Sequence, residues 1–177
     1  MNRVEFIVVD GEEPHLEIEV DGVPLKERAR RAERGSARAE RQERLAGAYG
    51  GLTHLDAVLW PSRHFLGSPV LSASGDGDTV LLGCDCGDWG CWPLSAEVRV
   101  LTGTVIWRAF RNGHRPSWDL SGLGLFEFDR DQYESALRAA QRPLPRERVR
   151  PPGPGLLAPL PSGANPSSPT RAGRLVP

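Results

Sequence analysis

The chain has 177 residues, 39% of them hydrophobic, which is enough for one domain with a buried core and too little for two domains of ordinary size. Its formal net charge of -1 gives no overall attraction to nucleic acid or to an anionic membrane. No apolar run approaches the ~18 residues that cross a bilayer, so we expect no membrane partner. The apolar run at the start turns acidic within a few residues, which predicts a strand, no signal peptide and a cytosolic protein.

Two strands are predicted at the beginning of the chain. Residues 4–9 are rich in β-branched side chains and are followed by Asp10 and Gly11, a pair that favours a turn. Residues 16–20 alternate between apolar side chains and glutamate. This pattern predicts an antiparallel hairpin with the glutamate face in water.

An arginine-rich region with helical composition follows the hairpin. Pro24 is tolerated in a first turn, and good helix formers continue over residues 25–34. We expect Gly35 and Ser36 to break this helix, and a second helical stretch to cover residues 37–46. The arginines are offset by four acids, Glu27, Glu33, Glu40 and Glu43. This balance favours a solvated helix over a nucleic-acid-binding face.

The middle of the chain predicts a three-strand meander. Strands are expected over residues 79–82, 92–101 and 104–110, separated by turn-forming residues. A short apolar stretch follows at residues 125–128, and Asp129 or Asp131 is expected to cap a last helix that ends near Ala140. The inward face of that helix is predicted to carry Tyr133, Ala136 and Leu137.

Together these elements predict an α+β fold: an antiparallel sheet of about five strands, made of the hairpin and the meander, with one or two packed helices. We assign residues 1–140 to this single domain. Residues 141–177 contain ten of the 16 prolines and almost no aromatic side chains. Such a segment buries too little apolar surface to offset its ordering entropy, so we expect a disordered C-terminal tail rich in proline and arginine.

All three cysteines, Cys84, Cys86 and Cys91, lie in one short stretch with Trp89 and Trp92. Residues two apart on a strand point to the same face, so Cys84 and Cys86 are expected to point together. The glycines of this stretch permit a tight reversal that returns Cys91 opposite Cys86. Three thiols that converge in a cytosolic protein suggest a zinc site more readily than a disulfide.

Zinc in a structural site takes four ligands, so a fourth residue is needed. We predict His114, because the meander returns its loop toward the sheet end where Cys91 lies. The weaker alternatives are Asp85, Asp88 and Asp119. The other histidines, His15, His54 and His64, have no cysteine nearby in the sequence, and we expect them to be surface or packed side chains.

The cysteine stretch and the segments after it carry a resemblance. The run LLGCDCGDWGCWPL and the later FRNGHR, WDLSGLG and FEFDRDQYESAL resemble a family of bacterial proteins that is common in actinobacteria and has no assigned activity. The similarity covers most of residues 1–140 and excludes the tail. It implies a single bacterial cytosolic domain marked by the motif CxCGxWGCWPL, and it implies no substrate.

Three interpretations of the cysteines stay open: a metal site, packed free thiols, and thiol or redox chemistry. The leading hypothesis is a small non-enzymatic protein with a structural or interaction role, in which Cys84, Cys86, Cys91 and His114 bind zinc. The second is a thiol-dependent enzyme or redox sensor, although Asp85 and Asp88 would work against an activated thiolate. The third is an immunity-type or regulatory module that binds a protein partner through its acidic surface.

Overall fold

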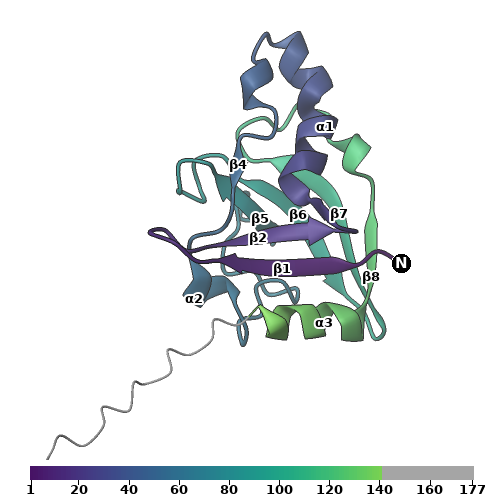
Figure 1. Cartoon of the computed structure of the whole chain (residues 1–177). Coiled ribbons are helices and arrows are strands. Elements are labelled where there is room, and N and C mark those ends of the chain that lie inside the picture. The colour runs from purple at the N-terminus through teal and green to yellow at the C-terminus, as the bar shows by residue number, and fades with distance from the viewer. Residues whose placement is uncertain (141–177) are drawn as a thin grey trace, which may run out of the picture. The chain divides into compact units, whose positions relative to one another are not determined.

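The structure, a computed structural model, describes residues 1–140. These residues form two antiparallel sheets and three α-helices, so the predicted α+β class is confirmed (Figure 1). The predicted tail, residues 141–177, lies outside the described residues. None of the helices within residues 1–140 is long and apolar enough to cross a membrane.

The predicted hairpin lies in the N-terminal sheet and not, as predicted, in one sheet with the meander, because its strand β2 is bridged to Leu52 and not to a strand of the meander. Its strands lie in the order β1-β2-β3, and they are β1 (Val4–Val9), β2 (His15–Val20) and β3 (Val23–Pro24). Strands β1 and β2 pair antiparallel from Val4↔Val20 to Val9↔His15. The alternation read in the sequence sorts the side chains as expected, because Leu16, Ile18 and Val20 are buried.

The second sheet has five strands in the order β4-β5-β6-β7-β8. They are β4 (Tyr49–Gly50), β5 (Thr79–Cys84), β6 (Leu94–Val100), β7 (Thr104–Asn112) and β8 (Phe126–Asp129). Strands β5, β6 and β7 form the predicted meander. Strand β8 extends it on one side and β4 on the other, and all neighbours are antiparallel.

The helix α1 (Leu25–Ala39) runs without a break through Gly35 and Ser36, so the predicted interruption is wrong. A glycine inside a helix costs only about 1 kcal/mol relative to alanine. Burial of Ala37 beyond it, at 0% exposure, offsets that cost. The chain then leaves the helix and makes one 3-10 turn, η1 (Glu43–Leu45), in place of the predicted second helix.

The last helix, α3 (Arg130–Ala139), agrees with its prediction. The side chain of Asp129 accepts a hydrogen bond from the backbone N–H of Gln132, at 2.9 Å, and so caps the first turn. The helix packs along β1 (Figure 1). Its Tyr133 is fully buried and meets Phe6 of the N-terminal sheet and Trp107 of the second sheet, with ring centroids 5.5 and 5.9 Å away. The core therefore lies where both sheets and α3 meet.

The segment around β4 joins the two sheets. Tyr49 is paired with Cys84 on one side, while the backbones of Leu16 and Leu52 exchange hydrogen bonds of 2.9 and 3.0 Å on the other. A side chain on Gly51 would come within 2.5 Å of the Leu16 carbonyl oxygen, so only glycine permits this approach. Two short elements complete the described chain, α2 (Leu55–Val58) and the 3-10 turn η2 (Ser121–Leu123).

Candidate metal centre

The cysteine tip, residues 84–91, is a compact turn between β5 and β6. Strand β5 ends at Cys84, whose carbonyl accepts a hydrogen bond from the N–H of Gly87 at 3.1 Å. The Asp88 carbonyl in turn accepts from the N–H groups of Cys84 and Cys91, at 3.2 and 3.3 Å. Gly87 has a φ of 91°, a conformation that favours glycine. These bonds fold the segment back on itself.

The turn brings the three cysteines together. Their sulfur atoms all lie within 4.8 Å of one another. The predicted convergence is therefore present, although Cys86 lies in the turn and not, as expected, on the strand with Cys84. Cys84 is 8% exposed, whereas Cys86 and Cys91 are exposed to solvent.

The spacing of the sulfur atoms fits a metal ion. Zinc binds thiolates at about 2.3 Å, which places neighbouring sulfurs of a tetrahedral site about 4 Å apart. The three sulfurs are close enough to one another to hold one ion. Thiolates are soft ligands that favour zinc or monovalent copper over calcium and magnesium.

The thiols of Cys84 and Cys86 differ in acidity. Burial raises the pKa of Cys84 to about 12, and its Sγ lies 3.4 Å from the Asp85 carboxylate. By contrast, a hydrogen bond from the backbone N–H of Asp88 holds the pKa of Cys86 below its ordinary value. The tip therefore combines one thiol with a lowered pKa, Cys86, and one with a raised pKa, Cys84. A metal ion that binds Cys84 would have to displace the proton of its thiol.

His114 lies beside the tip but is not part of the sulfur group. Its Nε2 is 3.2 Å from the carbonyl oxygen of Gly90, and its ring stacks on Trp92 at 6.3 Å with an interplanar angle of 16°. Its backbone N–H donates to the Asn112 side chain at 2.9 Å. The meander thus returns this loop to the tip as expected, and ligation by His114 stays a prediction.

Two of the three carboxylates named as alternative ligands, Asp88 and Asp119, have other partners. Asp88 accepts from the N–H of Gly90, and Asp119 accepts from the N–H of Ser121, each at 2.8 Å. Asp85 is the one that lies against a cysteine sulfur. Asp88 and Asp119 therefore each stabilise the turn in which they lie.

The other histidines are packed or exposed without a cysteine partner in the described residues. His64 is fully buried, and its Nε2 lies 2.8 Å from the carbonyl oxygen of Val80, so the expectation of a packed histidine is confirmed there. His54 lies edge-on to Trp89, with ring centroids 6.5 Å apart. His15 lies near Glu13 and Glu17 on the hairpin.

A buried polar network lies next to the tip and was not predicted from the sequence. Glu33, at 0% exposure, accepts hydrogen bonds from the Tyr49 hydroxyl and from the N–H of Gly47, the latter at 2.7 Å. The Tyr49 hydroxyl also accepts from the Asn112 amide at 2.8 Å. Burial raises the pKa of Glu33. One signal was available: Glu33 continues the four-residue spacing of the buried residues Leu25, Ala29 and Ala37.

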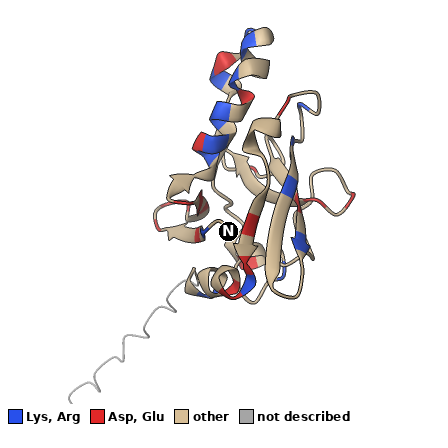
Figure 2. Ribbon diagram, turned by 90° about the vertical axis from the view of Figure 1, so that its right-hand side faces the viewer, with Lys and Arg blue, Asp and Glu red and all other residues tan. Residues whose placement is uncertain are grey.

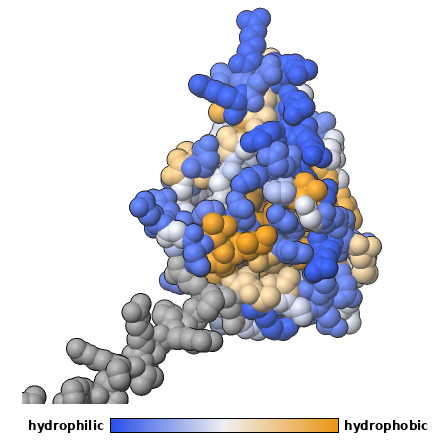
Figure 3. Space-filling model, in the orientation of Figure 1, coloured by the Kyte–Doolittle hydropathy of each residue, from blue (hydrophilic) through white to orange (hydrophobic). Residues whose placement is uncertain are grey.

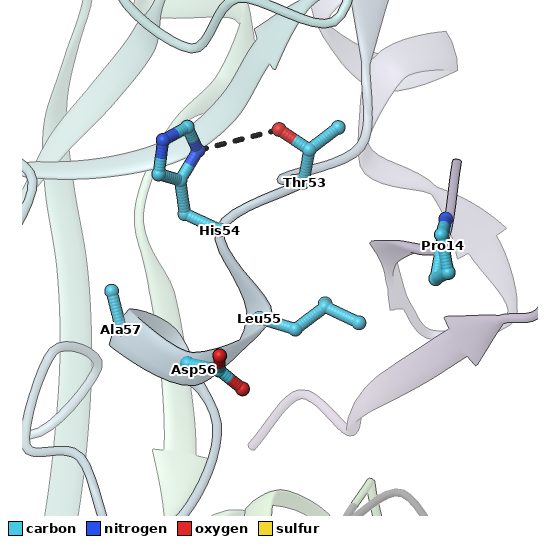
Figure 4. Close-up of a pocket in the computed structure, with 6 residues that line it drawn as sticks. All are labelled: Pro14, Thr53, His54, Leu55, Asp56 and Ala57. Atoms are coloured by element: carbon cyan, nitrogen blue, oxygen red, sulfur yellow. Dashed lines mark hydrogen bonds between the residues drawn. The ribbon is translucent and has the colours of Figure 1, made fainter.

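A separate cavity of about 300 Å³ lies beside α2 (Figure 4). Its lining includes His54 and Asp56, whose side chains point in different directions (Figure 4). The hydrogen bond drawn there joins the Thr53 hydroxyl and His54 Nδ1, at 3.3 Å. A catalytic acid–base pair needs convergent groups, and these two side chains do not converge.

Comparison of the chain with models of protein families, with curated proteins and with solved structures found no match.

Proposed function

We propose that the protein binds one zinc ion through Cys84, Cys86 and Cys91, in a structural or partner-recognition role without catalysis. The observation that supports the proposal is the approach of all three sulfurs to within 4.8 Å. A thiolate set of this kind stays reduced in the cytoplasm, which is the compartment the proposal assumes. The metal would fix a turn that is otherwise closed by only a few backbone hydrogen bonds.

His114 is the fourth ligand that we propose. Its imidazole already lies against Trp92 and the Gly90 carbonyl, one residue before Cys91. An imidazole completes a Cys3His set, which is common in structural zinc sites. The exposed position of Cys86 and Cys91 would leave part of the bound metal facing a partner.

A non-enzymatic role agrees with the hydrogen bonding at the tip. A thiol nucleophile needs a neighbouring base or cation. Within the described residues, no histidine is hydrogen-bonded to a cysteine sulfur, and the Cys84 thiol lies 3.4 Å from the Asp85 carboxylate. A carboxylate beside a thiol disfavours the thiolate.

The test is the metal content of the full chain, purified reduced, without a histidine tag or chelator, and measured by elemental mass spectrometry. We expect about one zinc per chain. Substitution of any one of the three cysteines, Cys84, Cys86 or Cys91, by serine should abolish zinc binding. Protein that is reduced, folded and free of metal, and that takes up none from added zinc, would overturn the proposal.

The fourth ligand is tested with a matched pair of histidines. His114 and His54 each lie against a tryptophan of the tip region, but only His114 is proposed to bind the metal. His114→Ala should weaken zinc affinity by about tenfold or more, and His54→Ala should leave it unchanged. Equal affinities in both variants would reject His114 and keep the three cysteines.

A second candidate function is redox sensing by the same thiols. It is favoured by Cys86, which is exposed and has a lowered pKa, beside a second exposed thiol, Cys91. A peroxide would oxidise the Cys86 thiolate to a sulfenic acid, and the Cys91 thiol would then displace water to form a disulfide. Slow reaction of metal-free protein with peroxide, at the rate of a free cysteine, would rule this candidate out.

A further inference from the structure

The end of α1 and the turn after it carry five exposed arginines. We call them the arginine surface: Arg31, Arg34, Arg38, Arg41 and Arg44. Figure 2 shows basic residues recurring along this helix, with acidic residues between them. The buried face of α1 is formed by Leu25, Ala29, Glu33 and Ala37, at intervals of four residues. Arg31, Arg34 and Arg38 are three and four residues apart, so they share one face, turned to solvent.

The glutamates that balance these arginines in the sequence do not balance them in space. Glu33 is buried and turned toward Tyr49. Glu40 accepts from Trp118 Nε1 at 2.8 Å and from Arg115 Nε at 3.1 Å, both outside α1. Two of the four acids are thereby directed to the body of the domain.

The remaining two glutamates neutralise little of the surface. Glu27 pairs with Arg30, at 2.6 Å, one turn before the arginine surface begins. Glu43 reaches Arg38 at 3.9 Å, the outer limit of an ion pair, with both side chains about two-thirds exposed. Across residues 1–140, no ion pair involves Arg31, Arg34, Arg41 or Arg44. The surface is thus locally cationic although the whole chain has a net charge of -1.

The surroundings of the arginine surface indicate the kind of partner. The large apolar side chains exposed on residues 1–140 are Met1, Val70, Leu101 and Leu125, none of them on α1 or η1. In Figure 3 the region of α1 farthest from β1 is mostly hydrophilic, and the most hydrophobic residues gather near the N-terminal sheet. A protein interface needs an apolar centre, and a membrane-surface helix needs an apolar face. Binding to phosphates needs neither.

We propose that the arginine surface binds the phosphate backbone of nucleic acid without reading its sequence. Guanidinium groups bind phosphate oxygens in a bidentate manner and stay charged at any physiological pH. Along a helix axis with a rise of about 1.5 Å per residue, Arg31 and Arg38 lie roughly 10 Å apart, a distance over which a duplex presents several phosphates. Gly35 stands between them with open space where a side chain would be, so a backbone can approach the helix closely.

This inference does not depend on the zinc proposal, because the two use different elements and different residues. Metal content and nucleic-acid affinity are measured separately. The failure of one leaves the other untouched.

The test measures binding of the full chain to a fluorescently labelled DNA duplex and to a single-stranded RNA, by fluorescence anisotropy over a salt series. The test variant is Arg31→Gln/Arg34→Gln/Arg38→Gln. The control, Arg3→Gln/Arg99→Gln/Arg138→Gln, removes the same charge from exposed arginines elsewhere that pair with Glu5, Glu97 and Glu134. Both variants keep the six arginines of residues 141–177, so the comparison isolates α1.

We expect the test variant to lose at least about tenfold in affinity at about 50 mM salt, and the slope of log affinity against log salt to become shallower by about 0.9 for each phosphate contact removed. The control should change either quantity by less than about twofold. Circular dichroism checks that α1 is retained, which glutamine favours as a good helix former. Should the triple variant unfold, Arg41→Gln/Arg44→Gln, which lies outside α1, gives the decision, with a smaller loss of the same kind.

Three results would overturn the proposal. The first is no binding of the wild-type chain to either nucleic acid at low salt. The second is an equal loss of affinity in the test and control variants, which would assign the binding to net charge. The third is equally tight binding of polyglutamate, which would make the partner an acidic polypeptide.

Discussion

The cysteine tip lies next to the network of Glu33, Tyr49 and Asn112, since Tyr49 is paired with Cys84. The two regions differ in how far their polar groups are hydrogen-bonded to other parts of the protein. In the network, each oxygen of the Glu33 carboxylate accepts a hydrogen bond from another part of the protein. At the tip, three sulfurs face one another, and two of them are exposed.

This difference distinguishes polar groups that stabilise the fold from groups that could bind a ligand. A buried polar group whose partners are all protein atoms holds elements together, and here it ties α1 to β4 and β7. The three converging thiols of the tip lie close enough together to hold a metal ion. The network should therefore govern stability, and the tip should govern ligand binding.

The largest expected effect is on the network. Glu33→Ala leaves the buried Tyr49 hydroxyl and the Gly47 N–H without their acceptor, which should lower the free energy of unfolding by about 3 kcal/mol in urea titrations. Glu27→Ala is the control on the same helix. Its carboxylate is partly exposed and, among residues 1–140, forms an ion pair with Arg30, so a loss below about 0.5 kcal/mol is expected.

The same carboxyl should make stability depend on pH. Burial raises the pKa of Glu33 above its ordinary 4.5, so the folded protein holds this proton more tightly than the unfolded chain. The resulting stabilisation is complete below pH 4.5 and is lost as pH rises through the raised pKa. Unfolding of the wild type and of Glu33→Gln, measured across that range, should show the decline in the wild type only. Parallel curves would mean that Glu33 is charged in the fold.

A smaller effect is expected from Tyr49→Phe. Removal of the hydroxyl leaves one Glu33 oxygen and the Asn112 amide unpaired, at a cost of about 2 kcal/mol. Tyr133→Phe provides the comparison, because its buried hydroxyl also bonds two groups, the Trp107 indole and the Phe65 carbonyl. Denaturant midpoints close to wild type for Tyr49→Phe would show that the network adds no stability.

A stabilising change is expected on α1. Gly35→Ala should raise the free energy of unfolding by about 0.8 kcal/mol, since the position is helical and has open space for a methyl group. Gly22→Ala is matched in space, but its φ of 70° strains any side chain, and it should destabilise by about 1 kcal/mol. Thermal melts of both variants test the pair, and a fall in stability for Gly35→Ala would mean that the helix is interrupted there.

The smallest effect on stability should come from the tip. Cys86→Ser changes an exposed side chain and should alter the unfolding free energy of metal-free protein by less than about 0.5 kcal/mol. The same variant should lose its zinc. With added zinc, the melting temperature should rise for the wild type and not for the variant. A large loss of stability in metal-free Cys86→Ser would assign the tip to the architecture instead.

Local patterns were sufficient to predict most of the fold. The alternation in β2, the turn residues of the meander and the Asp129 cap each depend on neighbours in the sequence, and the structure contains all three. The break at Gly35 failed because a propensity of about 1 kcal/mol was outweighed by the burial of Ala37. Strand β4 has only two residues and no pattern of its own, so the division into two sheets was not predictable.

The candidate site was predictable to a similar depth. Cysteine spacing and the glycines of the turn were enough to predict that the sulfurs converge. The surrounding chemistry depends on contacts far apart in the chain. From the sequence alone, Glu33 is interpreted as a surface charge, and only the contact with Tyr49 shows its role in the core. Glu40 is likewise interpreted as a partner for the arginines of α1, whereas in the structure it binds Trp118 and Arg115.

The bridge between Leu16 and Leu52 has a consequence for how the domain opens. Both residues are completely buried, and their backbone hydrogen bonds join the hairpin to the segment that follows β4, the strand whose Tyr49 pairs with Cys84. Separation of the two sheets would have to break these hydrogen bonds, so we expect these amides to exchange hydrogen with solvent mainly when the whole domain unfolds. Slowed exchange at Leu16 on addition of zinc would report an event at the tip from the other sheet, because an ion bound to the native state protects every amide that depends on global opening.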